Sequence, residues 1–406
     1  MRKLSVIILC HNNLHIDKVV ESVICQEADT DETFVVDDHS DLPIKALLED
    51  AAFKNVKILH PAEKGNRSAN RNLAAKQATG DLFVFIDGDV LIEKGALDKI
   101  RLLDFENITG ACGAVAAIRM QPESVAIDCK SYQIAINPWE RDFDFWHSRY
   151  PDARVRTNAL PWNRFYTAFS VIPRDKFFAV GQFDEVFCGW GGEDIDIGYR
   201  LSKLGELQIF SDIRGVHIPH RRNIRKEELS GRKNMYQMLN KYRNRDMEEL
   251  LSFALSSSAH EGMETVLEKM RTFPDTFDRK PDGKDLVLSV VSCKNPNGKI
   301  AYKNNGETKE EEFIGLALPF EEGRFENAYT STDIFSYPEV LATRIIQEML
   351  RVSKEVHIYK SLPKHIQWEG VEEKFKYIFC YYKIYLFSDS YQDFDIRDCG
   401  EYYTVE

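Results

Sequence analysis

The stretch Phe83-Val84-Phe85-Ile86-Asp87-Gly88-Asp89 is an apolar run that ends abruptly in two carboxylates. Apolar residues without polar alternation are typical of a strand that is buried on both faces of a sheet. The chain before it repeats this pattern, with short apolar runs at 5–9, 33–36 and 56–59 and helical spacing at 15–26, 43–53 and 67–78. Strands that alternate with helices predict an α/β fold with a mostly parallel, Rossmann-like sheet.

The length of 406 residues predicts more than one domain, because single hydrophobic cores stop growing at roughly 250–300 residues. The composition changes between about 250 and 280, where Ser, Ala, Pro and Asp accumulate. We therefore expect a first domain at 1–250 and a smaller C-terminal α/β domain at 260–406. No motif indicates what the second domain does, and three roles are open: holding an acceptor, forming a homo-oligomer or binding a partner protein.

The overall charge and the cysteines limit the classes of function. The net charge is −12, which argues against a general nucleic-acid binder. No apolar run reaches the roughly 18–20 residues that cross a bilayer, so we expect no transmembrane segment. The eight cysteines form no C-x-x-C pair, which indicates neither a zinc site nor a disulfide framework and favours a cytoplasmic protein.

The carboxylates after the fourth apolar run are placed to bind a ligand. In parallel sheets ligands bind beyond the carboxyl ends of the strands, where Asp87 and Asp89 follow one strand and Asp38 follows another. Hard oxygen ligands suit Mg²⁺ or Mn²⁺, which can also bind a diphosphate. The alternative for Asp-Gly-Asp alone is an ordinary turn that ends a strand.

A second polar group lies in the segment 181–201, where Trp190 stands among glycines and is followed by Glu193 and Asp194. Glycines allow the backbone to approach a ligand closely, and an aromatic ring can stack on the apolar face of a sugar. One carboxylate can accept the proton of an acceptor hydroxyl while the other orients it. Acidic residues also favour the first turn of any helix, but that alternative does not explain Trp190.

The segment G-Q-F-D-E-V-F-C-G-W-G-G-E-D-I-D-I-G-Y-R-L at 181–201 resembles a signature shared by family 2 glycosyltransferases, chondroitin-polymerase-like enzymes and β-1,4-galactosyltransferases. Four further motifs occur in the order of family 2: S-V-I-I at 5–8, V-V-D-D-H-S at 35–40, G-N-R-S-A-N-R-N at 65–72 and D-G-D at 87–89. The resemblance covers about residues 1–225. It implies a GT-A fold and transfer of a sugar from a nucleotide-diphosphate donor.

The resemblance also implies roles on the donor side. Asp38 resembles the aspartate that reads the uracil base, and Arg71 occupies the position of a polar residue near the nucleotide. Asp87 and Asp89 look like the metal-binding motif, with Asp89 as the direct ligand of Mn²⁺ or Mg²⁺. Family members use a further histidine as a metal ligand, for which we favour His217 and keep His220 as the second choice.

On the acceptor side, Asp194 resembles the general base and Glu193 the carboxylate that orients the acceptor. Trp190, Gly191 and Gly192 are similar to residues that form the acceptor pocket. The chain departs from the family pattern at His39 and Gln182, where glycines are usual, and at Cys10-His11, which replace a proline and an aromatic residue. None of these changes removes a carboxylate.

These observations predict a metal-dependent glycosyltransferase that uses a UDP-sugar and inverts the anomeric carbon. The acceptor can be a carbohydrate, a lipid-linked sugar, a peptide or a small molecule. A retaining transferase and an inactive nucleotide-sugar binding module are the alternatives. A sugar nucleotidyltransferase is disfavoured, because the residues after the first predicted strand, Cys10-His11-Asn12-Asn13, contain no glycine.

Overall fold

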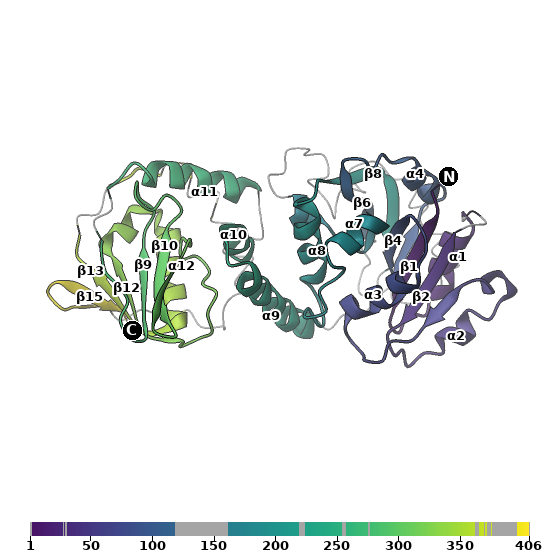
Figure 1. Ribbon diagram of the computed structural model, residues 1–406, viewed down its shortest axis with the longest axis horizontal. Coiled ribbons are helices and arrows are strands. Elements are labelled where there is room, and N and C mark those ends of the chain that lie inside the picture. Colours follow the sequence, from purple (N-terminus) through teal and green to yellow (C-terminus); the bar gives the residue numbers. More distant parts are fainter. Residues whose placement is uncertain are drawn as a thin grey trace, which may run out of the picture. The chain divides into compact units, whose positions relative to one another are not determined.

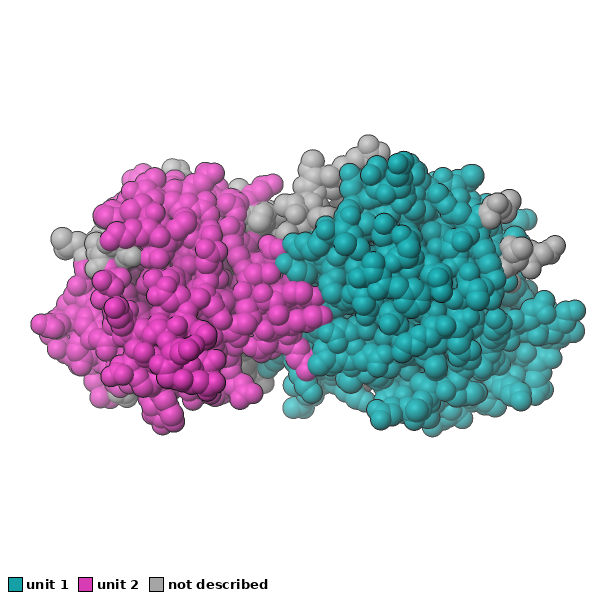
Figure 2. Space-filling model, viewed as in Figure 1, with its two compact units in different colours: residues 1–234 teal, residues 235–406 magenta. Residues whose placement is uncertain are grey.

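The computed structural model describes residues 2–26, 28, 31–117, 161–218, 224–253, 257–274, 277–361, 365–368, 370–371, 375 and 396–405. The chain divides into two compact units, residues 1–234 and 235–406, which Figure 2 colours separately. Each unit has a β-sheet of its own (Figure 1). The expected α/β architecture is therefore present in both parts of the chain.

Unit 1 is built on an eight-stranded mixed sheet with the order β3-β2-β1-β4-β7-β6-β8-β5. Strands β3, β2, β1 and β4 are parallel to one another, whereas β7 runs antiparallel to β4. The strands are β1 (Leu4–Cys10), β2 (Glu32–Asp37), β3 (Lys57–Leu59), β4 (Leu82–Asp87), β5 (Val90–Ile92), β6 (Ile108–Ala117), β7 (Phe169–Pro173) and β8 (Glu206–His217). The parallel arrangement brings the carboxyl ends of β1, β2 and β4 to one edge of the sheet.

Helices cover both faces of this sheet, as continuous apolar strands require. One core cluster joins the even-numbered residues of β1 to α1 (Ile16–Ile24) and α2 (Ile44–Leu47). The other joins the phenylalanines of β4 to α3 (Arg67–Gln77), α7 (Arg174–Ala179) and α8 (Glu193–Ser202). Unit 1 also contains α4 (Ala96–Leu102) and most of α9 (Ile224–Tyr242).

The observed elements agree with the sequence pattern at most positions, with two instructive differences. The helix expected at 43–53 is split into α2 and a 3₁₀ turn at Ala51–Phe53, because the Asp50 carboxylate accepts a hydrogen bond from the Ala52 amide and starts a new turn. The pattern also gave no sign of β5 and β6. The β6 sequence is rich in Ala and Gly, so it lacks the β-branched residues by which a strand is recognised.

Unit 2 contains a seven-stranded sheet with the order β11-β10-β9-β12-β13-β15-β14. Its strands are β9 (Asp285–Ser289), β10 (Lys299–Asn304), β11 (Glu307–Glu311), β12 (Phe325–Ser331), β13 (Ser353–Tyr359), β14 (Ile396–Asp398) and β15 (Tyr402–Val405). Its helices are α10 (Arg245–Phe253), α11 (Ser257–Met270) and α12 (Glu339–Val352). Helix α12 connects the parallel strands β12 and β13, and its apolar side is buried.

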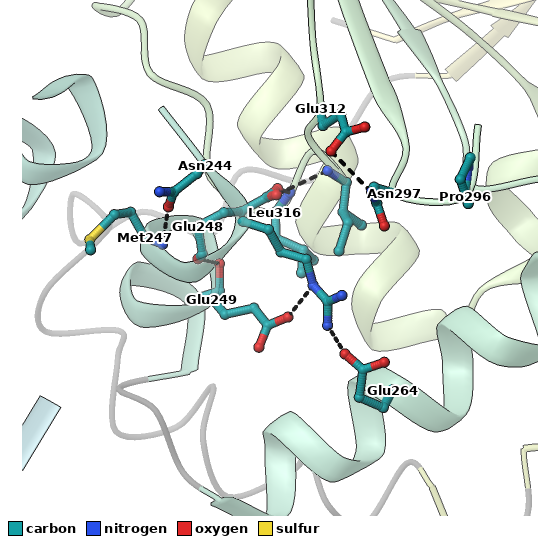
Figure 3. A network of polar contacts seen from close by, with 12 residues as sticks. Asn244, Met247, Glu248, Glu249, Glu264, Pro296, Asn297, Glu312 and Leu316 are labelled. Carbon is teal, nitrogen blue, oxygen red and sulfur yellow. Dashed lines mark hydrogen bonds and ion pairs between the residues drawn. The ribbon is translucent and has the colours of Figure 1, made fainter. Parts of the chain in front are cut away.

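The division at residue 234 lies before the boundary near 250–280 that composition suggested. The buried Glu248 of α10 explains where this helix belongs, because its carboxylate accepts hydrogen bonds from the amides of Ile314, Gly315, Leu316 and Ala317 at 2.7–3.4 Å. Figure 3 shows Glu248 and Leu316 of this network together with Glu249 and Glu264, both of which bind the Arg245 guanidinium. Helix α10 is thus part of unit 2.

Within the described ranges, no helix combines the length and the apolar character that spanning a bilayer demands.

Candidate active site

The Asp-Gly-Asp motif turns sharply at the end of β4, and Gly88 is essential to that turn. Its amide donates to the Leu9 carbonyl at 2.7 Å. A Cβ atom at Gly88 would lie 2.7 Å from the same oxygen and 3.1 Å from the Cα of Cys10. The backbone of β1 therefore leaves room for glycine alone at this position, and the two flanking aspartates are fixed on either side of it.

Asp89 meets His217 through the pairing of β5 with β8. Val90 pairs with His217 in the antiparallel register, and the Ile218 amide donates to the Asp89 carbonyl at 2.7 Å. This register places His217 Nε2 3.2 Å from Asp89 Oδ2, with about a fifth of each side chain exposed. The structure thus joins the predicted aspartate and the preferred histidine, whereas His220 lies outside the described residues.

Arg71 links the end of β4 to the start of α8. Its Nη2 lies 3.0 Å from Asp87 Oδ1 and its Nη1 lies 3.2 Å from Glu193 Oε1. The Arg71 and Glu193 side chains are almost completely buried, and Arg71 also lies over the ring of Phe183. A buried guanidinium that holds one carboxylate from each motif brings the two predicted constellations into one place.

Asp194 follows Glu193 in the first turn of α8 and is half-buried. Its Oδ1 accepts a hydrogen bond from the Ile195 amide at 2.8 Å. Burial, and next the negative charge of Glu193, raise the pKa of the Asp194 carboxyl to about 7, although Arg71 opposes the shift. A carboxyl group with a pKa near neutrality is suited to accept a proton in a reaction at physiological pH.

Arg67 is a residue that the sequence reasoning did not select. It lies one helical turn before Arg71 on α3 and is half-buried, so the two side chains share a face of the helix. Burial alone would lower the pKa of the Arg67 guanidinium, but four carboxylates raise it above its ordinary value; they belong to Glu193, Asp87, Asp89 and Asp194. Arg67 forms no ion pair within 4 Å with any described residue. The sequence signal that could have identified Arg67 was its position one helical turn before Arg71.

The glycine-rich loop before α8 is held from two sides. The Gly189 amide donates to the Gly65 carbonyl beside α3. From α9, the Ser230 hydroxyl accepts from the Trp190 amide, and the Asn234 amide group donates to the Gly191 carbonyl. These contacts require the left-handed conformations of Gly189, Gly191 and Gly192. The half-buried ring of Trp190 packs against Gly231, where a Cβ atom would lie 3.2 Å from the ring.

Asp38 lies beyond the end of β2 and is buried. Both of its carboxylate oxygens accept from the Gly65 amide, at 2.9 and 3.1 Å, so it ties β2 to the loop before α3. His39 and Gln182 both have positive φ angles, of 52° and 66°. The left-handed backbone explains why glycine is the usual residue at these two positions in the family that the sequence resembles.

The donor atoms at Asp89 and His217 suit a divalent cation, since a carboxylate oxygen and an imidazole nitrogen are both ligands of Mn²⁺. Groups of three or more His, Cys, Asp or Glu side chains arranged to hold a metal are absent from the described part of the chain. A cation at this place would need further ligands beyond the two side chains, and an oxygen-rich molecule such as a diphosphate has suitable oxygens.

The comparison with protein families agrees with this geometry. The model of glycosyl transferase family 2 matches residues 5–164, and that of the N-terminal domain of galactosyltransferase matches residues 154–221. Together they span the sheet, the Asp-Gly-Asp turn and α8.

Residues 5–221 of unit 1 thus match the sequence models of two glycosyltransferase families.

Similar proteins include the validoxylamine A glucosyltransferase of Streptomyces hygroscopicus, 27% identical over 180 residues, or 41% of this chain and 43% of the relative. The uncharacterized glycosyltransferase YfnE of Bacillus subtilis is 26% identical over 294 residues, covering 62% of this chain and 74% of that protein. The chain thus spans less than half the length of the first relative. A mannosyltransferase from Pyrobaculum calidifontis in complex with GDP-Man and Mn²⁺ gives a TM-score of 0.44 at 16% identity, over 60% of this chain and 65% of that one.

Proposed function

We propose that the protein transfers a sugar from a UDP-sugar to an acceptor hydroxyl, with inversion of the anomeric carbon and with the help of Mn²⁺ or Mg²⁺. The observation that carries this proposal is the Arg71 bridge between Asp87 and Glu193. Each of these carboxylates is a near neighbour of the residue that would do the chemistry, Asp89 on one side and Asp194 on the other. A donor and an acceptor bound between them would meet in one site.

The donor side is formed by the ends of β2 and β4 and by α3. Asp38 is the proposed contact to the uracil base, since a carboxylate has lone pairs beyond those that face Gly65. Arg71 is a positioning residue, because both of its terminal nitrogens already hold carboxylates. Arg67 is the guanidinium available to the diphosphate, as it lies near the carboxylates without an ion pair to a described residue.

Asp89 and His217 are the proposed protein ligands of the divalent cation. A cation held there would neutralise the negative charge that develops on the departing diphosphate. Asp87 is held by Arg71 at 3.0 Å, which fixes the other end of the motif. The single positive charge of Arg71 thus offsets one of the two negative charges of Asp87 and Glu193 before a donor binds.

Asp194 is the proposed general base. The acceptor oxygen would form a bond to the anomeric carbon as its proton passes to Asp194, and the bond from that carbon to the diphosphate oxygen would break with the electron pair leaving on the nucleotide. Attack on the side opposite the leaving group inverts the configuration. The buried Glu193 supports this step by holding Arg71 and by raising the pKa of Asp194.

Trp190, Gly191 and Gly192 are the proposed acceptor side. The loop that carries them is fixed by Ser230 and Asn234, so the ring would be presented in one orientation without an entropic cost on binding. Its chemistry fits the apolar face of a sugar ring. A carbohydrate, a lipid-linked sugar, a peptide or a small molecule can each supply the hydroxyl.

The first test is a screen of UDP-sugars for Mn²⁺-dependent release of UDP, followed by transfer assays with the active donor. Asp194→Asn should lower kcat by at least about 10²-fold while UDP still binds, and Asp175→Asn, an exposed change on α7, should leave kcat unaltered. Full turnover by Asp194→Asn would refute the assignment of the base. NMR of the product would decide between inversion and the alternative of retention, and binding of donor without any transfer would indicate an inactive binding module.

A further inference from the structure

Unit 2 has a second candidate ligand site, built from residues other than those discussed for sugar transfer. It is a cavity of about 760 Å³, within the range of about 300–1,000 Å³ that is usual for small-molecule sites. The segment 277–281 forms one wall, Lys294 and Asn295 of the β9–β10 connection form another, and the sheet forms the floor. The floor residues are Ser289 of β9 and Ala301 of β10, with Thr308 and Glu310 of β11 beside them.

The strand registers show which face of the sheet this is. Ser289 pairs with Lys299, and Ala301 pairs with Glu310, so the four side chains lie on the same face. The opposite face carries Leu288 and lies toward α12, because a Cβ atom added at Gly315 would lie 2.8 Å from the Leu288 side chain and 2.9 Å from that of Ile345 on α12. The cavity therefore lies on the face of the sheet opposite α12.

Arg279 stands between this cavity and a group of aromatic side chains on β12 and β13. Its guanidinium carbon lies 3.7 Å from the ring centre of Tyr329, and its Nη1 donates to the Tyr359 hydroxyl at 2.9 Å. The ring of Phe277, which also lines the cavity, lies 6.0 Å from that of Tyr359. Stacking and the hydrogen bond fix the guanidinium plane, while the buried Nε has no hydrogen-bond partner among the described residues.

The lining combines three kinds of chemistry. Ser289, Asn295 and Thr308 can exchange hydrogen bonds with hydroxyl groups, and Phe277 offers an apolar ring face. Cations outnumber anions, although the chain as a whole carries a net charge of −12. The charged lining residues are Arg279, Lys280, Lys294 and Lys299 against Asp278 and Glu310.

The excess of positive charge is available to a ligand. Lys299 is 3.4 Å from Glu310, so these two charges neutralise each other. Lys280 and Lys294 are exposed and form no ion pair with a described residue. A hydroxyl-rich molecule with an apolar ring face and a negative group matches all three features of the lining.

We propose that this cavity of unit 2 binds an acidic saccharide, that is, a sugar chain bearing a carboxylate. The choice of a saccharide as the ligand rests on the proposed function of unit 1, whereas the evidence for a binding site is the lining of the cavity in unit 2. Arg279 would hold the carboxylate and Phe277 would contact a ring. Unit 2 would then retain an acceptor chain during successive encounters with the transferase domain, which raises the effective concentration of its ends.

Isothermal titration calorimetry of the full chain tests this with a hyaluronan tetrasaccharide, which carries carboxylates, and with chitotetraose, a neutral chain of the same length. We expect saturable binding of the acidic chain and at least about tenfold weaker binding of the neutral one. Lys280→Gln combined with Lys294→Gln, at two exposed positions, should weaken the acidic chain about tenfold or more. Lys284→Gln combined with Lys354→Gln, which removes the same charge outside the cavity, should not.

Arg279→Gln should abolish binding of the acidic chain, with circular dichroism to verify that the variant is folded. Titration of UDP into the same samples measures nucleotide binding by unit 1 separately. If unit 1 is not a transferase, the saccharide titration still tests the proposal for unit 2. The proposal is overturned by equal affinity for both tetrasaccharides, by no binding of either, by equal losses in the two lysine pairs, or by inorganic phosphate competing at the same affinity as the acidic chain.

Discussion

Asp89 Oδ2 lies 3.2 Å from His217 Nε2, although the two residues are far apart in the chain. The contact follows from backbone pairing, because Val90 is opposite His217 and the Ile218 amide bonds to the Asp89 carbonyl. Two side chains whose backbones are fixed in this way need little rearrangement to share a cation.

The first prediction concerns this pair. Asp89→Asn and His217→Ala should each weaken Mn²⁺ binding by at least about tenfold, which corresponds to about 1.4 kcal/mol. Titration followed by Mn²⁺ electron paramagnetic resonance, with UDP present, measures the affinity. His365→Ala, an exposed histidine of unit 2, is the control. Unchanged affinity in both site variants would show that the cation binds elsewhere.

The second prediction is a pH dependence of transfer. The pKa of Asp194 is raised to about 7, and a general base acts only when deprotonated. The rate should therefore be nearly full above pH 8 and should fall about tenfold per pH unit well below pH 7. Measurements of kcat from pH 5 to 9 check this. A profile that is flat between pH 5 and 7 would contradict the role of Asp194, provided that UDP affinity is constant over that range.

The third prediction separates the two arginines of α3. Arg67→Gln should raise the dissociation constant of UDP about tenfold and lower the melting temperature less than Arg71→Gln does, because Arg67 interacts with four carboxylates but forms no ion pair within 4 Å among the described residues. Arg71→Gln should instead destabilise unit 1 by about 3–5 kcal/mol, since it leaves the buried Glu193 carboxylate without its partner. Calorimetry and thermal unfolding distinguish the two effects, and a UDP affinity unaffected by Arg67→Gln would remove Arg67 from the donor site.

The sequence was sufficient to predict the parallel half of unit 1, because apolar strands and helical spacing are local signals. It could not reveal that Arg71 reaches both Asp87 and Glu193, since that contact depends on how α3 and α8 pack on the same side of the sheet. Arg67 was missed for the same reason: its importance comes from carboxylates contributed by distant elements.

The fourth prediction concerns the turn between the two aspartates. Gly88→Ala would place a Cβ atom 2.7 Å from the Leu9 carbonyl oxygen, so β1 or the turn must shift, at a cost of about 1–3 kcal/mol. We expect loss of Mn²⁺ binding along with lower thermal stability. Gly95→Ala is the control variant, because a Cβ atom there would meet no atom within 4 Å. Only the positive φ of residue 95 would be strained, which should destabilise the protein by about 1 kcal/mol. Normal Mn²⁺ binding by Gly88→Ala would show that the turn tolerates displacement.

The last prediction concerns Glu248 (labelled in Figure 3), whose carboxylate accepts hydrogen bonds from four backbone amides of unit 2. Its Oε1 accepts three of them and its Oε2 accepts the Ile314 amide at 2.9 Å. In Glu248→Gln the side-chain amide would keep one acceptor oxygen and turn its NH₂ toward the remaining donor, which costs about 1–3 kcal/mol. Glu248→Ala would leave all four amides without the carboxylate and should cost more, whereas Glu321→Gln, at an exposed position, should be neutral. Urea unfolding followed by tyrosine and tryptophan fluorescence measures the free energies of unfolding of the three variants.

Because Glu248 belongs to unit 2, UDP affinity in unit 1 should be the same in all three variants. Equal stability of the Gln and Ala variants would mean that the amides find other partners when the carboxylate is removed.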